Sequence, residues 1–89
     1  MLYMLINRTK SNLTPEQYTQ LGRLAEAFYQ NVPSGLKLQG DWAANDGSRT
    51  FAMVETDDPE LLAAVQAPFQ SYVDIEIIAV TPVTGWNRR

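Results

Sequence analysis

Apolar and polar positions alternate from Leu36 to Thr56, on both sides of the sequence Asn45-Asp46-Gly47-Ser48. This pattern predicts a β-hairpin, because alternation is typical of a half-buried strand and Asp-Gly tolerates the positive φ angles of a type I′ turn. A two-residue loop at Asp46-Gly47 pairs Trp42 with Phe51, whereas a four-residue loop would shift this register and a slip of one residue would swap the two faces. The two-residue loop places the following side chains on one face of the sheet: Leu36, Leu38, Trp42, Phe51, Met53 and Glu55.

Two amphipathic helices are predicted on either side of the hairpin. Thr14-Pro15 with Gln17 has the residues of a capping box, and apolar residues then recur every three or four positions to about Asn31. Asp58-Pro59 repeats this start signal, because an acidic N-cap followed by proline is typical of a first helical turn. Pro68 is expected to kink or end the second helix.

Short apolar runs over residues 2–7 and 73–81 predict two further strands. The resulting order is strand, helix, strand, strand, helix, strand, which is the ferredoxin-like βαββαβ pattern. We therefore expect an α+β fold, a four-stranded antiparallel sheet with two helices on one face. Residues 1–84 would form this single domain, and residues 85–89 a C-terminal tail whose two arginines lie in solvent.

The sheet face away from the helices is predicted to be apolar. We expect it to expose Trp42, Phe51 and Met53, together with Tyr3 and Leu5 from the first strand. An apolar patch of that size does not normally stay in water. The chain has 89 residues and no Cys, so it has a small core and no disulfide to support it. These features predict that the protein pairs with a second copy of itself as a homodimer.

Charge and hydropathy exclude several classes of partner. The net charge is -3, and between Asp41 and Glu76 the only basic residue is Arg49. Such a surface repels phosphate, which argues against nucleic acid and anionic membranes as partners. No segment approaches the ~20 apolar residues of a membrane span, and no secretory signal pattern is present. We therefore expect a cytoplasmic protein.

The residue types present also limit the chemistry. The chain has no His and no Cys, which excludes His-based triads, thiolate nucleophiles, ordinary zinc sites and a His-ligated haem. The glycines do not have the spacing of a phosphate-binding loop. Asp57-Asp58 resembles a metal-binding pair, but an N-cap before Pro59 explains it better. We expect no metal and no cofactor.

The candidate site residues lie on the predicted apolar face. Glu55 is the candidate catalytic residue, because burial among Trp42, Phe51 and Met53 would suit a carboxyl group to proton transfer. The alternative interpretation is that Glu55 lies at the end of a strand, where its carboxylate is in water or pairs with a basic group. Trp42 could stack on a planar ligand or simply pack in the core or in a dimer interface. The candidate ligand-binding residues are Trp42, Phe51, Met53, Tyr3 and Asn7.

Six segments carry a family resemblance: Met1 to Ile6, Pro33-Ser34-Gly35-Leu36, Trp42, Glu55-Thr56-Asp57-Asp58, Val73-Asp74-Ile75-Glu76 and Val80. Together they resemble an uncharacterised bacterial family of domains of unknown function in the dimeric α+β barrel superfamily. That superfamily includes antibiotic-biosynthesis monooxygenases, muconolactone isomerases and haem-binding chlorite dismutases. The resemblance implies two sheets packed face to face and room for a small ligand between sheet and helices or inside the barrel. It implies a fold and no particular reaction.

Two functional hypotheses remain. The first is a homodimeric α+β barrel that binds a small, partly apolar molecule, with cofactor-free monooxygenase or isomerase chemistry. The alternative is a non-enzymatic assembly or protein-interaction module whose sheet face only packs against its partner. A cavity of a few hundred Å³, the size typical of ligand sites, would favour the first hypothesis. The sequence names neither the ligand nor the reaction.

Overall fold

The computed structural model describes residues 1–86, with helices and strands in the order that the sequence predicts. The main elements are β1 (Leu2–Thr9), α1 (Pro15–Gln30), β2 (Leu36–Ala43), β3 (Thr50–Thr56), α2 (Pro59–Gln66) and β4 (Val73–Val80). A 3-10 turn at Ala67–Phe69 continues α2, and a short helix, α3 at Val83–Trp86, follows β4. The two arginines predicted to lie in solvent fall outside the described residues.

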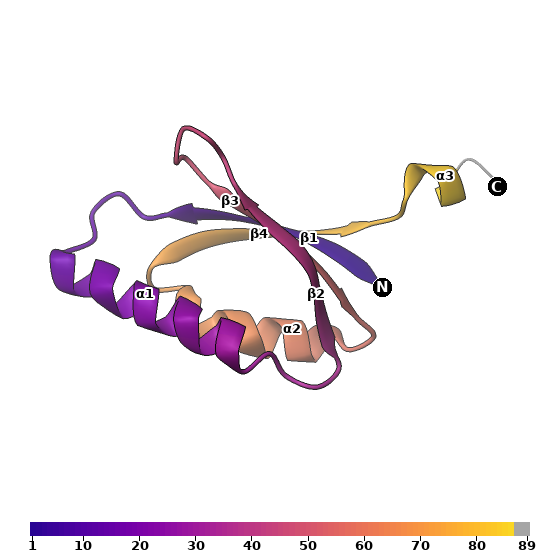
Figure 1. Ribbon diagram of the computed structural model, residues 1–89, viewed down its shortest axis with the longest axis horizontal. Helices are drawn as coiled ribbons and strands as arrows, with labels where there is room; N and C mark the ends of the chain where they lie inside the picture. The colour runs from indigo at the N-terminus through magenta and orange to yellow at the C-terminus, as the bar shows by residue number, and fades with distance from the viewer. Residues whose placement is uncertain (87–89) are drawn as a thin grey trace.

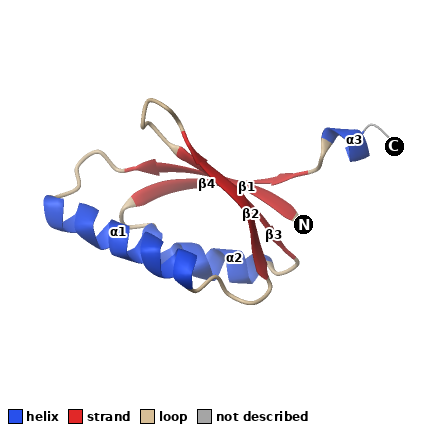
Figure 2. Ribbon diagram, in the orientation of Figure 1, coloured by secondary structure: helices blue, strands red, loops and turns tan. Residues whose placement is uncertain are grey.

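The four strands form one antiparallel sheet in the order β2-β3-β1-β4. Helices α1 and α2 lie side by side against the same face of this sheet, as Figure 1 shows. Figure 2 shows the same two layers, with the strands on one side and both helices on the other. The structure therefore confirms the predicted ferredoxin-like fold.

Both main helices begin at the predicted caps. The Thr14 backbone N–H donates to Gln17 Oε1 at 2.7 Å, and the Gln17 N–H donates to Thr14 Oγ1 at 3.2 Å. These reciprocal bonds satisfy two backbone groups that a helix start would leave unpaired. At α2, Asp58 Oδ1 accepts from the backbone N–H groups of Glu60 and Leu61, at 3.0 and 3.3 Å. As predicted, α2 ends close to Pro68, where the chain tightens into the 3-10 turn.

The turn of the hairpin differs from the predicted type I′ geometry. Gly47 has a φ of 75°, but no residue other than glycine has a positive φ among the described residues, so Asp46 does not take the predicted conformation. The Gly47 N–H instead donates to the Ala44 carbonyl, and the Ala44 N–H donates to the Arg49 carbonyl, both at 2.9 Å. Asp46 Oδ1 accepts from the Ser48 N–H at 2.9 Å, which stabilises this longer loop without a second positive φ.

The predicted register holds near the turn and fails farther from it. Trp42 pairs with Phe51 and Gly40 pairs with Met53, as predicted. An irregularity between Leu38 and Gly40 then leaves Gln39 as an extra, unpaired residue of β2. Leu38 therefore pairs with Val54 and not with Glu55, its partner in the predicted register. A β-bulge of this kind reverses the alternation of side chains along the strand. The prediction that Leu36 and Leu38 share a face with Trp42 is therefore wrong.

A second correction concerns β1. Tyr3 pairs with Val54 and Leu5 pairs with Ala52, so both side chains face the helices and not the free side of the sheet. Met4 lies on the free side instead, because it pairs with Met53. Residues 2–6 are apolar without alternation, so their sequence contains no indication of which side chains face the helices.

The corrected registers define the two faces of the sheet. The open face, which neither α1 nor α2 covers, carries Leu2, Met4, Ile6, Arg8, Lys37, Trp42, Phe51, Met53, Glu55, Asp74, Glu76, Ile78 and Val80. The helix face carries Tyr3, Leu5, Asn7, Thr9, Leu36, Leu38, Asp41, Ala43, Thr50, Ala52, Val54, Thr56, Val73, Ile75, Ile77 and Ala79. The buried core cluster of Leu5, Leu36, Val54 and Leu62 lies between the helix face and the helices.

The positive φ of Gly47 leads to a stability prediction. Gly47→Val should lower the free energy of unfolding by about 1–2 kcal/mol, because an L side chain is strained in the left-handed region. Open space surrounds Gly47, so backbone strain is the only cost. Gly22→Val is the matched control, since Gly22 also has no atom within 4 Å of an added Cβ but lies inside α1. Chemical denaturation of both variants checks this, and equal midpoints would contradict the turn geometry.

Candidate functional site

A cavity of about 390 Å³ lies between the helix face of the sheet and helices α1 and α2. Its volume is in the range typical of small-molecule sites. The wall is mostly apolar and includes Leu21, Ala25 and Phe28 from α1, together with Val65 from α2. The sheet side of the wall is formed by Leu5, Leu36, Leu38, Ala43, Ala52, Val54, Val73 and Ile75. The space therefore suits an apolar molecule.

Six residues with polar side chains interrupt this apolar wall: Asn7, Thr9, Tyr29, Asp41, Thr50 and Gln66. Asn7 and Thr50 face each other across β1 and β3, and Asn7 Nδ2 donates to Thr50 Oγ1 at 3.3 Å. Tyr29, near the end of α1, donates its hydroxyl hydrogen to the Asp41 carboxylate on β2. These pairs bring hydrogen-bonding groups from two sides of the cavity, and Asp41 is the one acidic side chain of the wall among the described residues.

The Tyr29–Asp41 hydrogen bond joins α1 to the edge strand β2 at a solvent-exposed part of the cavity wall. The Tyr29 ring also meets the edge of Phe28, with ring centroids 5.5 Å apart and an interplanar angle of 70°. The hydrogen bond to Asp41, partial burial and the nearby carboxylate charge together raise the pKa of Tyr29 to about 12. Tyr29 therefore stays protonated at neutral pH and acts as a hydrogen-bond donor there.

Gln66 is a cavity residue that the sequence reasoning missed. It is the last residue of α2 and is only 6% exposed. Its Nε2 has no hydrogen-bond partner among the described residues. The helical spacing of Leu62 and Gln66 was the available signal, since it places a polar side chain on the apolar stripe of α2.

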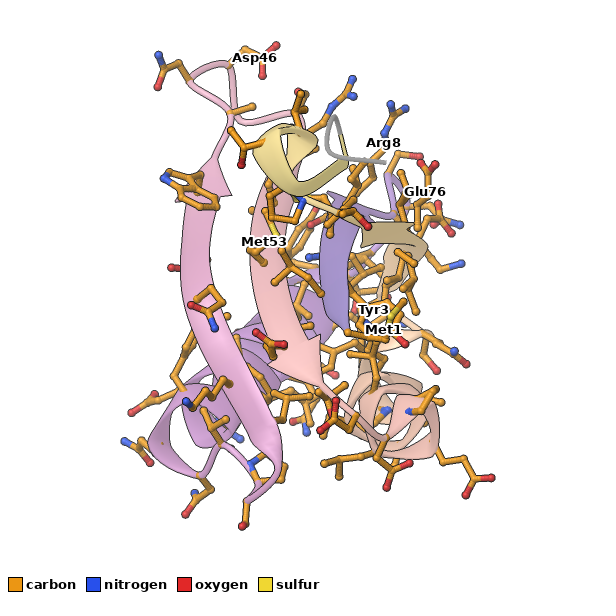
Figure 3. The ribbon with its side chains drawn as sticks, turned by 90° about the vertical axis from the view of Figure 1, so that its right-hand side faces the viewer. Met1, Tyr3, Arg8, Asp46, Met53 and Glu76 are labelled. Atoms are coloured by element: carbon orange, nitrogen blue, oxygen red, sulfur yellow. The ribbon has the colours of Figure 1, made fainter. Side chains whose placement is uncertain are left out.

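The predicted ligand-binding residues separate into two groups. Asn7, Trp42 and Phe51 contribute to the cavity wall. The Trp42 side chain itself lies on the open face, where its indole covers Gly40; a Cβ added at Gly40 would come within 2.9 Å of the Trp42 ring. Tyr3 packs against the core cluster, and Met53 lies in the middle of β3 on the open face (Figure 3). The structure therefore does not bring all five together.

Glu55 lies outside the cavity. Its side chain is half exposed on the open face, and its Oε2 is 3.6 Å from the amino group of Met1. The same amino group is 3.4 Å from the Asp57 carboxylate, so it pairs with two acidic side chains. This geometry matches the alternative of a strand-end carboxylate in an ion pair. The catalytic role proposed for Glu55 from the sequence stays a prediction.

Among residues 1–86, no three or more acidic, His or Cys side chains are grouped closely enough to hold a metal ion. None of the helices in this part of the chain is long and apolar enough to cross a membrane.

Comparisons with known proteins place this chain among domains of one fold. The sequence model of a domain of unknown function, DUF3303, matches residues 1–87. The crystal structure of muconolactone isomerase superimposes with a TM-score of 0.66 at 17% identity, covering 92% of this chain and 90% of that one. The crystal structure of SCO4226 from Streptomyces coelicolor A3(2) gives 0.55 at 18% identity, covering 92% and 98% of the two chains.

A crystal structure of an antibiotic biosynthesis monooxygenase has a TM-score of 0.53 at 11% identity and covers 92% of this chain and 100% of that one. No curated protein matches the chain. At such low identities the likeness extends to the fold alone. These matches confirm the predicted resemblance to an uncharacterised family with the fold of those enzymes.

The Tyr29–Asp41 contact gives a pH-dependent prediction. The phenol of Tyr29 should titrate with a pKa of about 12, against an ordinary pKa of 10.0. Asp41→Asn should lower this pKa toward the ordinary value, because it removes the carboxylate that accepts the Tyr29 hydrogen bond. Between pH 10 and about pH 12 the folded protein keeps the Tyr29 proton, whereas the unfolded chain releases it. The free energy of unfolding should therefore fall as the pH rises through this range.

Ultraviolet titration of the tyrosines, with Tyr29→Phe to assign the signal, measures this ionisation. Asp46→Asn is the control, because Asp46 lies at the tip of the hairpin, at the opposite end of the view from α1 and α2 (Figure 3). If the pKa of Tyr29 stayed equally high in Asp41→Asn, the assigned Tyr29–Asp41 hydrogen bond would be wrong.

Proposed function

This chain belongs to the DUF3303 family of domains of unknown function, and we propose that it is a homodimeric α+β barrel that binds a small, partly apolar molecule. The ligand would occupy the cavity between the sheet and the two helices. The observation that carries this proposal is the cavity itself, about 390 Å³ in a domain of 89 residues. The space is partly open to solvent, and concave spaces of this volume with mostly apolar walls are the usual sites of small-molecule binding.

The open face supports the proposal of a homodimer. Among the described residues only five hydrophobic side chains are buried, namely Leu5, Leu36, Val54, Leu62 and Val73. All of them lie on the helix side of the sheet or on α2, whereas Trp42 and Ile78 on the open face are 57% and 40% exposed. Two open faces packed together would cover this apolar surface and bury roughly 1,600 Å² or more, as specific interfaces do.

The polar groups of the cavity limit the chemistry that a bound ligand can meet. The names of the structural neighbours suggest isomerisation or oxygenation. If such a reaction used no cofactor, it would need a base beside the ligand. Asp41 is the carboxylate of the cavity wall, and Tyr29 beside it holds its proton at neutral pH. We therefore propose binding as the function and Asp41 as the base of any proton transfer. The competing proposal, an assembly module without a ligand, predicts an open-face dimer and no binding in the cavity.

Adjacent residues of β4 test the dimer. Ile78 lies on the open face and Ile77 on the helix face, and their exposures are similar at 40% and 44%. Ile78→Asp should dissociate the dimer, because a carboxylate buried in an apolar interface has no partner. Ile77→Asp should leave the dimer intact. Light scattering gives the mass of each variant, and a wild-type species of only 10.0 kDa at high concentration would contradict the proposal.

Filling the cavity tests ligand binding. Ala25 on α1 forms part of the cavity wall, whereas Ala27 is exposed on the same helix. Ala25→Phe should weaken binding of the neutral fluorescent probe N-phenyl-1-naphthylamine by at least about tenfold, because the added ring occupies the space of the probe. Ala27→Phe should bind the probe like the wild type. Equal affinities of the two variants would place the probe elsewhere, and the cavity would then not be the binding site.

A further inference from the structure

We propose that the side-chain amide of Gln66 selects the ligand, and that the ligand is a neutral, largely apolar molecule with a carbonyl oxygen. This inference rests on the proposed function and names the chemical class that the cavity would take. Its starting point is the buried amide of Gln66, whose Nε2 finds no hydrogen-bond partner in the part of the chain that the structure describes.

Two polar side chains are buried among the described residues, and they differ in their hydrogen bonds. Thr56 is 2% exposed, and its Oγ1 accepts from the Asp58 N–H at 3.1 Å, next to the cap of α2. Gln66 is 6% exposed, and its Nε2 has no partner. Buried donors are almost always paired in proteins, because an unpaired one costs free energy. The burial of the Gln66 amide without a hydrogen bond therefore needs a reason other than the fold, whereas the hydrogen bond of Thr56 accounts for its burial.

The position of Gln66 supplies that explanation. It belongs to the cavity wall, together with Val65 and Phe69 from the same end of α2. The last torsion of a glutamine side chain is broad and roughly two-fold, so rotation about it can turn the amide nitrogen toward the cavity when a ligand binds. A ligand acceptor would then complete the hydrogen bond that is missing in the protein. Phe69 and Val65 would pack against the apolar part of the same ligand.

The charges around the cavity favour a neutral acceptor over a carboxylate. Among residues 1–86, the wall contains the acidic residue Asp41 but neither Lys nor Arg. A ligand carboxylate would be buried there without a cation and near a like charge, which is strongly unfavourable. A ketone, ester or lactone carbonyl accepts a hydrogen bond from an amide and carries no net charge. The geometry thus points to a neutral carbonyl compound.

Two probes of the same ring shape test this inference. Fluorenone and fluorene are both neutral and planar, and they differ by one carbonyl oxygen. Equilibrium dialysis should show that the wild-type protein binds fluorenone at least about fivefold more tightly, the worth of one hydrogen bond. Gln66→Met, which keeps the length of the side chain, should bind both probes equally and retain the affinity for fluorene. Gln70→Met is the control, because Gln70 is exposed just beyond the 3-10 turn.

Unfolding measurements accompany the binding experiment. Gln66→Met should unfold at the same or a higher denaturant concentration than the wild type, because it removes an unpaired buried amide. Gln66→Leu, a second variant whose side chain has no hydrogen-bond donor, should also lose the preference for the ketone.

If either Gln66 variant kept the wild-type preference, or if the wild type bound the two probes equally, the assignment of Gln66 would be wrong while the proposed binding function remained. If the wild type bound neither probe, both the assignment and the proposed function would fall.

Discussion

The pairing of β1 with its two neighbours is the constraint on which the rest of the structure depends. β1 is a central strand and is bonded to β3 on one side and to β4 on the other. The pair of Leu5 with Ala52 turns Leu5 toward the helices, where it joins the core cluster with Val54 and Leu62. A slip of one residue would turn the apolar residues of each face to the other side. The cavity and the open face both follow from this one register.

The bulge at Gln39 divides β2 into two parts with different tasks. Before it, Leu36 points to the helices and is 5% exposed; after it, Trp42 points to the open face and is 57% exposed. Without the extra residue, one of these large side chains would be on the wrong face. Asp41, beyond the bulge, keeps the hairpin register and faces the helix side, where its carboxylate accepts a hydrogen bond from Tyr29. One irregular residue thus lets a single strand contribute to the core, the cavity and the open face.

The cavity combines weak packing with polar groups that the core does not require. Its mostly apolar wall stays partly open to solvent, so the fold leaves apolar surface there that a ligand could bury. Gln66 adds an unpaired buried donor to the same wall. Local departures from good packing and complete hydrogen bonding are typical of functional sites. This coincidence of space and polarity is the strongest indication of binding in the molecule.

Local patterns in the sequence determined the elements of this protein, and only the tertiary structure decided its faces. Thr14, Asp58 and Pro68 act within one or two turns of chain, so the helix boundaries were predictable from neighbouring residues. The pairing of Trp42 with Phe51 was predictable for the same reason, since the two strands follow each other. The phase of β1 was not, because Tyr3 and Leu5 lie in an uninterrupted apolar run and their orientation depends on Val54 and Ala52, about 50 residues away.

The bulge at Gln39 left no local signal, because it is stabilised by the packing of Leu36 and Leu38 under the helices. The candidate site therefore moved from the open face to the helix side of the sheet. Three of the predicted residues still belong to the wall of this site, namely Asn7, Trp42 and Phe51. The roles of Gln66 and the Tyr29–Asp41 pair follow only from the packing of α1, α2 and β2 in the folded protein. Composition excluded the classes of chemistry that need His or Cys, whereas the position of each remaining polar group depends on contacts between elements distant in the chain.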